Sequence, residues 1–347
     1  MKAAVYHKPA DIAVEERDVY DILDDEMLLR TRAASICGTD LRIFKAGHFK
    51  IPGGSSRVLG HEVSGEIARV GSLVRGFREG MRVSFTPNIG CGRCEMCRQG
   101  YNNMCPDYEA FGISVDGGFQ EYMVVPNIAI RGGNVFEVAE NLSFEEAAVV
   151  EPLSCCYNAF SGLKVTPEDT VLVIGPGPIG ACFVQLAKAS GARKIIVAGR
   201  RDERLREMER FGADITVNSR DKDLKAEIDR ITAGRGVDVV ITAASSPELQ
   251  PLAVELLATH GRVNFFGGLP KGSLAEIDTN RVHYRGLTLT GTTGSSNEDY
   301  YRSMQLVANG QINVRDIVSH RFPIDDIGAA FALAQTGTVM KSMIVHH

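Results

Sequence analysis

The chain has 347 residues, of which 44% are hydrophobic and 23% charged, and its formal net charge is -5. This composition is typical of a folded globular protein, and the length favours two domains over one. The acidic balance and interspersed charges argue against a nucleic-acid partner. No apolar run reaches the roughly 20 residues of a membrane helix, and the first residues lack the apolar core of a secretion signal, so we expect a cytoplasmic protein with no membrane partner.

The first 152 residues predict a β-rich domain. Short apolar runs at 62–70, 81–85 and 119–125 are separated by Gly and Pro, as in strands joined by tight turns. The rhythm of the sequence changes near Glu151, which we take as the domain boundary.

The second part of the chain predicts a parallel sheet. Apolar runs alternate with amphipathic helical stretches, which is the pattern of βαβ units. Six strands are expected at 171–174, 194–198, 214–217, 238–242, 262–266 and 287–290.

Capping residues place the expected helices of this part. The first helix follows residue 178 and ends at Gly191, and the second begins at an Asp202 cap and ends at Gly212. A third covers 247–258. From residue 295 the pattern predicts a helix, a strand at 317–322, another helix and a final strand, which we expect to pack back on the first domain.

Four of the eight cysteines lie close together in the sequence and predict a structural zinc site. Their two-residue gaps let a looping chain turn several thiolates toward one tetrahedral ion, and neighbouring glycines permit the turning. Buried cysteines gathered by chance are the alternative, which this spacing disfavours. The four residues are Cys91, Cys94, Cys97 and Cys105.

A second set of metal-binding residue types is spread over the first domain. Cys37, His61 and Glu62, with Glu151 at the boundary, offer a thiolate, an imidazole and two carboxylates. Three protein ligands would leave one position open for substrate, as catalytic zinc requires. Taken singly, each residue also suits a packed thiol, a buried histidine or a carboxylate at a helix N-terminus.

A glycine-rich turn after the strand at 171–174 predicts a dinucleotide site. Gly175 would make the tight turn, Gly177 would admit the pyrophosphate, and Gly180 would allow close packing of the helix. The turn also contains Pro178 and Ile179, whose helix N-terminus would face the negative charge.

The residues after the second strand bear on the choice between NAD and NADP. A carboxylate near this point usually holds the ribose hydroxyls of NAD, but here Gly199 is followed by Arg200 and Arg201. Two guanidiniums could grip a 2′-phosphate, which tips our expectation toward NADP. Asp202 could still reach a ribose, and the arginines could be solvated charges at a helix start.

Four segments of the chain resemble, in order and spacing, those of the zinc-containing medium-chain alcohol dehydrogenases. They are CGTD at residue 37, GHExxGxxxxxGxxV at residue 60, CxxCxxCx7C at residue 91 and EPLS at residue 151. The EPLS segment is similar to that of sorbitol or iditol dehydrogenases. The resemblance implies an α/β protein with a GroES-like catalytic domain of residues 1–152 and 294–347, a zinc lobe at about 88–106, and a doubly wound, six-stranded Rossmann domain of residues 153–293. It also implies a homodimer or homotetramer.

For the reaction, the resemblance implies two zinc ions per chain and hydride transfer between a secondary alcohol and NAD(P). Cys37 and His61 would bind the catalytic zinc with Glu62, and Glu151 would act through water or by exchange with Glu62. Zinc would polarise the alkoxide, and Thr39 would relay the proton.

The resemblance favours a polyol, sugar alcohol or cyclitol as the small-molecule substrate. Animal sorbitol dehydrogenases carry an Arg-Tyr pair where this chain has Gly294 and Ser295, so a different hydroxyl pattern is expected. One alternative is a zinc dehydrogenase of another secondary alcohol or of L-threonine. A non-catalytic zinc-stabilised binding or sensor protein is another, which the second set of metal-binding residues disfavours.

Overall fold

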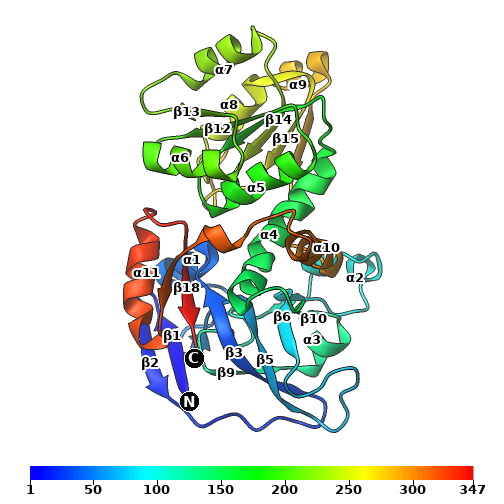
Figure 1. The fold of residues 1–347 in the computed structure, drawn as a ribbon, viewed down its shortest axis with the longest axis vertical. Helices are drawn as coiled ribbons and strands as arrows, with labels where there is room; N and C mark the ends of the chain where they lie inside the picture. The colour runs from blue at the N-terminus through cyan, green and yellow to red at the C-terminus, as the bar shows by residue number, and fades with distance from the viewer. Residues whose placement is uncertain (347) are drawn as a thin grey trace. The chain divides into compact units, whose positions relative to one another are not determined.

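The computed structural model describes residues 1–346. The chain forms two compact units: unit 1 comprises Met1–Ser154 and Gly294–His347, and unit 2 comprises Cys155–Thr293 (Figure 1). The sequence-based boundary at 152 differs from this one by two residues. Within the described part of the chain, no helix combines the length and the apolar character needed to cross a bilayer.

Unit 1 is built mainly on antiparallel strands. Over the described residues its largest sheet has seven strands, in the order β10-β6-β5-β3-β18-β17 with β9 also paired to β3, and a smaller sheet has the order β2-β1-β4. The strands are β1 (Lys2–Lys8), β2 (Asp11–Glu16), β3 (Met27–Ser35), β4 (Arg57–Val58), β5 (Glu62–Val70), β6 (Arg82–Phe85), β7 (Asn88–Ile89), β8 (Glu109–Ala110), β9 (Tyr122–Val125), β10 (Val135–Glu137), β17 (Val318–Phe322) and β18 (Lys341–Val345).

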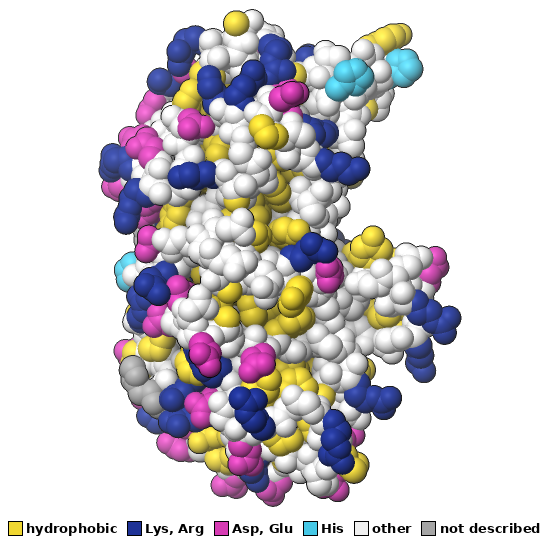
Figure 2. All heavy atoms as spheres, turned by 45° about the vertical axis from the view of Figure 1, so that its right-hand side comes forward, with side chains coloured by type: hydrophobic (Ala, Val, Ile, Leu, Met, Phe, Trp, Pro, Cys, Tyr) yellow, Lys and Arg dark blue, Asp and Glu magenta, His cyan; other side chains and the backbone are white. Residues whose placement is uncertain are grey.

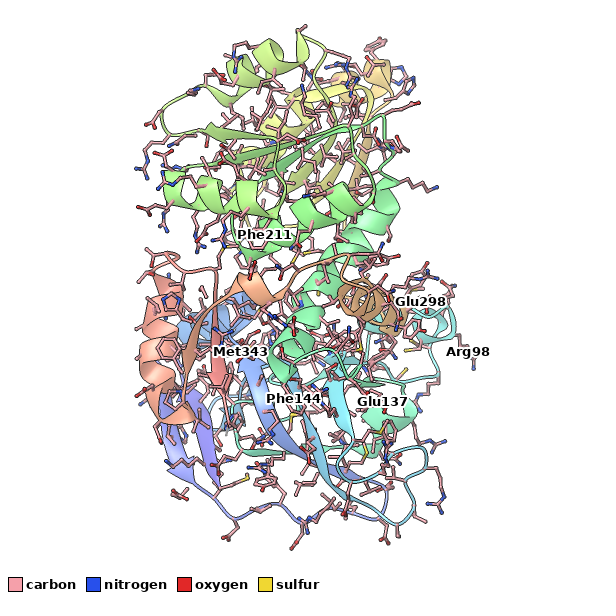
Figure 3. The ribbon with its side chains drawn as sticks, in the orientation of Figure 1. Arg98, Glu137, Phe144, Phe211, Glu298 and Met343 are labelled. Atoms are coloured by element: carbon pink, nitrogen blue, oxygen red, sulfur yellow. The ribbon has the colours of Figure 1, made fainter. Side chains whose placement is uncertain are left out.

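The C-terminal strand is part of this sheet. Strand β18 pairs antiparallel with β3, which places Met343 opposite Ser35 (Figure 3). On its other side, β3 pairs with β5, and there Ser35 lies opposite Glu62. Residues from the first fifth of the chain and from its last strand therefore meet at one end of the sheet.

The helices of unit 1 lie around these sheets. They are α1 (Gly38–Ala46), α2 (Glu95–Arg98), α3 (Asn127–Arg131), α10 (Asn297–Ala308) and α11 (Ile327–Gln335), with 3-10 turns η1 (Asn102–Met104), η2 (Arg315–Ile317) and η3 (Ile324–Asp326). Aromatic rings join them to the core: Phe119 makes an edge contact with Phe331 of α11 at 5.9 Å between centroids.

A long helix, α4 (Phe144–Leu163), begins in unit 1 and ends in unit 2. Its first turn is capped by Ser143, whose hydroxyl accepts from the Glu146 backbone while the Glu146 carboxylate accepts from Ser143. The Arg82 guanidinium lies 4.6 Å from the centre of the Phe144 ring, and the Ser64 hydroxyl donates to the Phe144 carbonyl (Figure 3). These contacts fix the first half of α4 on strands β5 and β6.

Unit 2 is a doubly wound parallel sheet. Among the described residues it has six strands in the order β13-β12-β11-β14-β15-β16, which confirms the predicted Rossmann-like fold. The strands are β11 (Thr170–Ile174), β12 (Lys194–Gly199), β13 (Ile215–Asn218), β14 (Val237–Thr242), β15 (Leu257–Phe265) and β16 (Thr288–Gly291). The helices are α5 (Pro178–Ala189), α6 (Asp202–Phe211), α7 (Leu224–Thr232), α8 (Leu249–Glu255) and α9 (Thr279–Arg285).

Several details of unit 2 differ from expectation. Asp202 is the first residue of α6 rather than its cap, because Arg201 occupies the N-cap position and the Asp202 carboxylate accepts from the Asn218 amide at 2.7 Å. The helix expected at 247–258 is shorter, since β15 begins at Leu257. Helix α7 was not predicted, because it buries only Leu224 and Ile228.

Candidate metal and cofactor sites

The structure brings three of the predicted ligands to one point. One ligand atom each from Cys37, His61 and Glu62 lies within 4.8 Å of the others. Cys37 is the N-cap of α1. Glu62 is the first residue of β5 and His61 directly precedes it, and at this point β5 pairs with the end of β3, two residues before Cys37. A thiolate, an imidazole and a carboxylate are the donor set that a catalytic zinc site uses, so the residues present fit this metal.

Asp40 lies beneath this group and is fully buried. Its carboxylate accepts from the backbone N–H of Cys37 at 2.8 Å and of Gly60 at 3.2 Å, and Oδ1 lies 3.5 Å from Nδ1 of His61. A carboxylate in this position orients a metal-binding imidazole and leaves Nε2 for the metal. Burial by itself would lower the pKa of His61, but Asp40 and Cys37 outweigh it and hold that pKa well above its ordinary value.

Glu62 is held on both of its oxygens. Lys341 of β18 donates to Oε1 at 2.6 Å, and the Ser35 hydroxyl donates to Oε2. Burial would lower the pKa of Lys341, but Glu62, Cys37 and Glu151 together raise it. Sequence reasoning gave no role to Asp40, although it is the last residue of the CGTD segment. It also missed Ser35 and Lys341, and no local motif marks a lysine that opens an apolar C-terminal strand.

Glu151 lies in the interior of α4, next to Pro152, and is 5% exposed. The compact ligand group found among the described residues does not include it. Its charge nevertheless acts on Lys341, and it helps to raise the pKa of Tyr300, whose shift comes mainly from burial. The negative charge of Glu151 therefore contributes to the electrostatic environment of Lys341.

Thr39 is half-buried in the first turn of α1, two residues after Cys37. Its hydroxyl oxygen accepts from Nη2 of Arg42 at 3.0 Å. Arg42 had no role in the sequence-based prediction, although its spacing of three residues along a helix would place it beside Thr39.

The four clustered cysteines form the second group whose sulfur atoms lie within 4.8 Å of one another. All four are free thiols: Cys91, Cys94, Cys97 and Cys105. Backbone N–H groups of Arg93 and Cys94 lower the pKa of Cys91 to about 6, whereas burial raises that of Cys97 to about 12. A Cβ on Gly90 would lie 2.6 Å from the Cys97 sulfur, so a side chain there would push into the cluster. This donor set fits a closed structural zinc site.

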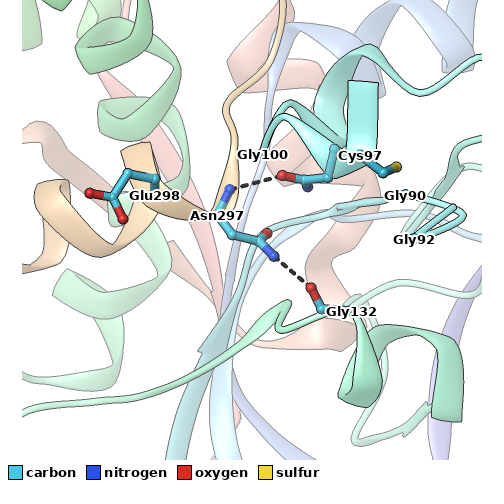
Figure 4. A pocket seen from close by; sticks show the side chains of 8 residues that line it. Gly90, Gly92, Cys97, Gly100, Gly132, Asn297 and Glu298 are labelled. Atoms are coloured by element: carbon cyan, nitrogen blue, oxygen red, sulfur yellow. Dashed lines mark hydrogen bonds between the residues drawn. The ribbon is translucent and has the colours of Figure 1, made fainter. Parts of the chain in front are cut away.

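Asn297, the first residue of α10, connects this helix by hydrogen bonds to the segment that contains the four cysteines, at about 88–106, which we call the cysteine lobe. The Asn297 backbone N–H donates to the Asn102 side chain at 3.0 Å, and its side-chain amide donates to the Gly132 carbonyl at 2.7 Å (Figure 4). Its side-chain oxygen accepts from the Thr86 hydroxyl at 2.6 Å. Asn297, Asn102 and Gly132 border a cavity of about 320 Å³ whose wall includes Cys97. The contacts anchor the lobe to the main body of unit 1.

The glycine turn in unit 2 has the geometry of a phosphate-binding turn. Gly175 has a φ of +122°, and a Cβ on Gly180 would collide with the Gly175 carbonyl, so these two positions require glycine. Gly177 is the N-cap of α5, and Pro178 is the first residue of the helix. A Cβ on Gly177 would meet nothing within 4 Å. The open space at a helix N-terminus fits a dinucleotide pyrophosphate.

Gly199 ends β12 beneath this turn. A Cβ at this position would lie 2.6 Å from Cδ of Pro176, which excludes any longer side chain without a shift of the turn. Arg200 and Arg201 follow it and are exposed. On the molecular face in Figure 2, Lys and Arg side chains are interspersed with Asp and Glu.

Comparisons with known proteins agree with this geometry. Residues 178–309 match the family described as zinc-binding dehydrogenase, and residues 23–131 match the alcohol dehydrogenase GroES-like domain. The chain is 34% identical to sorbitol dehydrogenase of Bacillus subtilis, covering 99% of this chain and 97% of that protein. It is also 34% identical to L-threonine 3-dehydrogenase of Pyrococcus abyssi, covering 98% and 97%. The NADP-bound structure of a Sinorhizobium meliloti 1021 protein superposes with a TM-score of 0.91 at 31% identity, covering 99% of each chain.

Proposed function

Because the chain belongs to the zinc-binding medium-chain alcohol dehydrogenase family, a family of zinc-dependent enzymes that transfer hydride between alcohols and NAD(P), we propose that it interconverts a polyol and its ketone at a secondary carbon. The observation that carries this proposal is the convergence of Cys37, His61 and Glu62 on one point. The similarity to a sorbitol dehydrogenase over nearly the whole chain favours the polyol class.

The candidate site residues of unit 1 have distinct roles in the proposed reaction. When bound, zinc polarises the alcohol oxygen and the nicotinamide accepts the hydride. Cys37 and His61 hold the metal, and Asp40 keeps the imidazole in place. Thr39, half-buried two residues after Cys37, would accept the alcohol proton at Oγ1 and release its own hydroxyl proton to solvent. Removing the hydroxyl with Thr39→Val should lower kcat, whereas Thr39→Ser should retain most of it.

In our proposal, Glu62 and Glu151 alternate as the carboxylate ligand of the catalytic zinc. Both oxygens of Glu62 accept hydrogen bonds, from Ser35 and from Lys341, so zinc bound by Glu62 would share its carboxylate with these two donors. Glu151, whose charge acts on the same lysine, would take its place by exchange. We expect Glu62→Gln and Glu151→Gln each to lower turnover at least about a hundredfold. Metal analysis then assigns the inner ligand, because only its loss should release the catalytic zinc.

A substrate screen tests the proposed class directly. Initial rates would be measured with sorbitol, galactitol, arabitol, myo-inositol, 2,3-butanediol and L-threonine, each with NAD and with NADP. We expect the highest kcat/KM with a polyol. The alternative is L-threonine, which is favoured by the similarity to the Pyrococcus abyssi enzyme; a clear preference for it would replace the polyol assignment. No oxidation of any alcohol would reject a catalytic function and leave a zinc-stabilised binding protein.

We propose that the enzyme prefers NADP to NAD. Gly199 leaves no room for a carboxylate at the end of β12, and Asp202 is engaged by Asn218. Replacing Arg200 and Arg201 together by Gln should reduce kcat/KM for NADP more than about tenfold and leave that for NAD nearly unchanged. Arg206→Gln, on the exposed face of α6, is the matched control. A wild-type enzyme with a strong preference for NAD would refute the proposal.

The homodimer or homotetramer implied by the resemblance remains a prediction. Sedimentation velocity at micromolar concentration would distinguish either assembly from a monomer of 37.6 kDa.

A further inference from the structure

Lys341 is a buried cation inside the candidate metal site. It opens strand β18, is 5% exposed, and donates to Oε1 of Glu62 at 2.6 Å. Glu62 is itself fully buried and provides one of the three ligand atoms that lie within 4.8 Å of one another. The ammonium therefore contacts a carboxylate that a metal ion at this site would also use.

A second donor holds the other oxygen of the same carboxylate. Strand β3 pairs with β5 so that Ser35 lies opposite Glu62, and the Ser35 hydroxyl donates to Oε2. Ser35 and Lys341 are both buried, so water competes little for these two hydrogen bonds. The orientation of Glu62 is thus fixed by residues of two strands other than its own.

The number of carboxylates on the metal decides whether a catalytic site stays open. A catalytic zinc uses three protein ligands and keeps a fourth position for substrate, whereas four protein ligands close the site. Cys37 and His61 supply two ligands, and in the proposed function Glu62 and Glu151 alternate as the third. Simultaneous binding of both carboxylates would fill the position that the substrate needs.

The charge beside Glu62 decides how strongly this carboxylate is drawn to a metal ion. A carboxylate in the protein interior needs a cation beside it, and here that cation is Lys341. Without the ammonium, a bound metal ion would be the cation that compensates Glu62, and the carboxylate would bind it more firmly. Lys341 thus competes with the metal for the same carboxylate.

We propose that Lys341 is a positioning residue that keeps Glu62 from closing the catalytic metal site and so preserves the position for the substrate. The inference rests on the proposed function, because it concerns how the same metal site stays open. It also accounts for a buried lysine in a site that must hold a divalent cation, where a positive charge otherwise opposes metal binding.

A neutral metal ligand tests whether the fourth position is open. Imidazole would be titrated into protein whose zinc has been exchanged for cobalt, and visible absorption would report its binding. A closed four-cysteine site offers no position to imidazole, so the change in absorption comes from the catalytic site. We expect Lys341→Met to raise the Kd for imidazole at least about tenfold while the catalytic metal is retained.

The double variant Lys341→Met, Glu62→Gln tests whether Glu62 causes the closure. Its amide carries no charge with which to bind the metal, so the Kd for imidazole should return to within about threefold of the wild-type value. Imidazole binds as a neutral molecule, so loss of the lysine charge alone should change its affinity little. Lys45→Met, at an exposed lysine in the last turn of α1, is the control and should leave the Kd unchanged.

Metal content separates the proposed role from a purely structural one. If Lys341 only stabilises the fold, Lys341→Met will lose the catalytic metal or leave the Kd for imidazole unchanged, and either result would overturn the inference. Release of the metal from Glu62→Gln would overturn it too, since Glu62 would then be the permanent ligand. Lys341→Gln takes the place of Lys341→Met in the same measurements if the latter does not fold. Because no alcohol is used, the outcome is independent of the substrate screen, which alone decides the polyol function.

Discussion

The Lys341 ammonium lies 2.6 Å from Oε1 of Glu62, and both side chains are buried in unit 1. Glu62 belongs to the ligand group with Cys37 and His61, so the last strand of the sheet contributes directly to the proposed metal site. Two charges in the protein interior depend on each other, because removal of one leaves the other desolvated and unpaired.

Lys341→Met should therefore reduce the free energy of unfolding by about 3–5 kcal/mol. Urea unfolding in the presence of a chelator would measure the loss, because a bound cation would otherwise compensate Glu62. The double variant Lys341→Met, Glu62→Gln should recover much of the stability, since it leaves no unpaired charge. Lys2→Met, which breaks the exposed pair with Asp325, is the control and should change little. Equal losses in the single and double variants would contradict this account.

Cys94→Ser should lower the zinc content from two ions per chain to one. The remaining three thiolates cannot complete a closed tetrahedral site, and the lobe should lose its stability before the rest of unit 1. Metal analysis and limited proteolysis of the lobe would test this. Cys37→Ser is the counterpart: it should abolish turnover while the cysteine lobe retains its ion. Two zinc ions in purified Cys94→Ser protein would show that Cys94 is not required to hold the ion.

Gly199→Ala should destabilise the protein by about 1–3 kcal/mol, because the new Cβ would lie 2.6 Å from Cδ of Pro176. Gly162→Ala, near the end of α4, meets nothing within 4 Å and should cost no stability. Thermal unfolding of the two variants makes the comparison. For the same steric reason, Gly199→Asp should fail to create an NAD-preferring enzyme, and a fully active, NAD-specific Gly199→Asp protein would disprove the clash.

Glu146 should make stability depend on acid pH. Burial would raise its pKa, but the hydrogen bonds from Ser143 and the ion pair with Arg315 lower it below the ordinary value of 4.5. A carboxyl group with a depressed pKa in the folded state contributes stability above its unfolded pKa, and the contribution disappears as the pH falls through the folded value. The difference in unfolding free energy between wild type and Glu146→Gln should be largest near neutral pH and shrink below about pH 4.5. A difference independent of pH would refute the assignment.

The parts of the fold with a strong local pattern were predictable. The six parallel strands, the turn at Gly175 and the end of α6 at Gly212 all follow from apolar runs and from glycines that adopt a positive φ. Helix α4 was not recognised as one continuous element, because Pro152 in its interior is normally a signal for a helix boundary.

The candidate site was predictable only where a motif spans it. Cys37, His61 and Glu62 were found because they lie in short segments of characteristic spacing. Lys341 was not, because its importance comes from a tertiary contact with a glutamate 279 positions away. A charged residue at a strand end looks like a surface residue until the pairing of the strands is known.

The return of the C-terminus to strand β3 also constrains the order in which the protein matures during synthesis. Residues 155–293 leave the ribosome as a complete unit, while the sheet that was started first still lacks β18. Glu62 is synthesised 279 positions before its partner Lys341. The nascent polypeptide can thus complete its nucleotide-binding unit before the strand that brings Lys341 to Glu62 has been made, and any product that terminates before β18 will lack this ion pair.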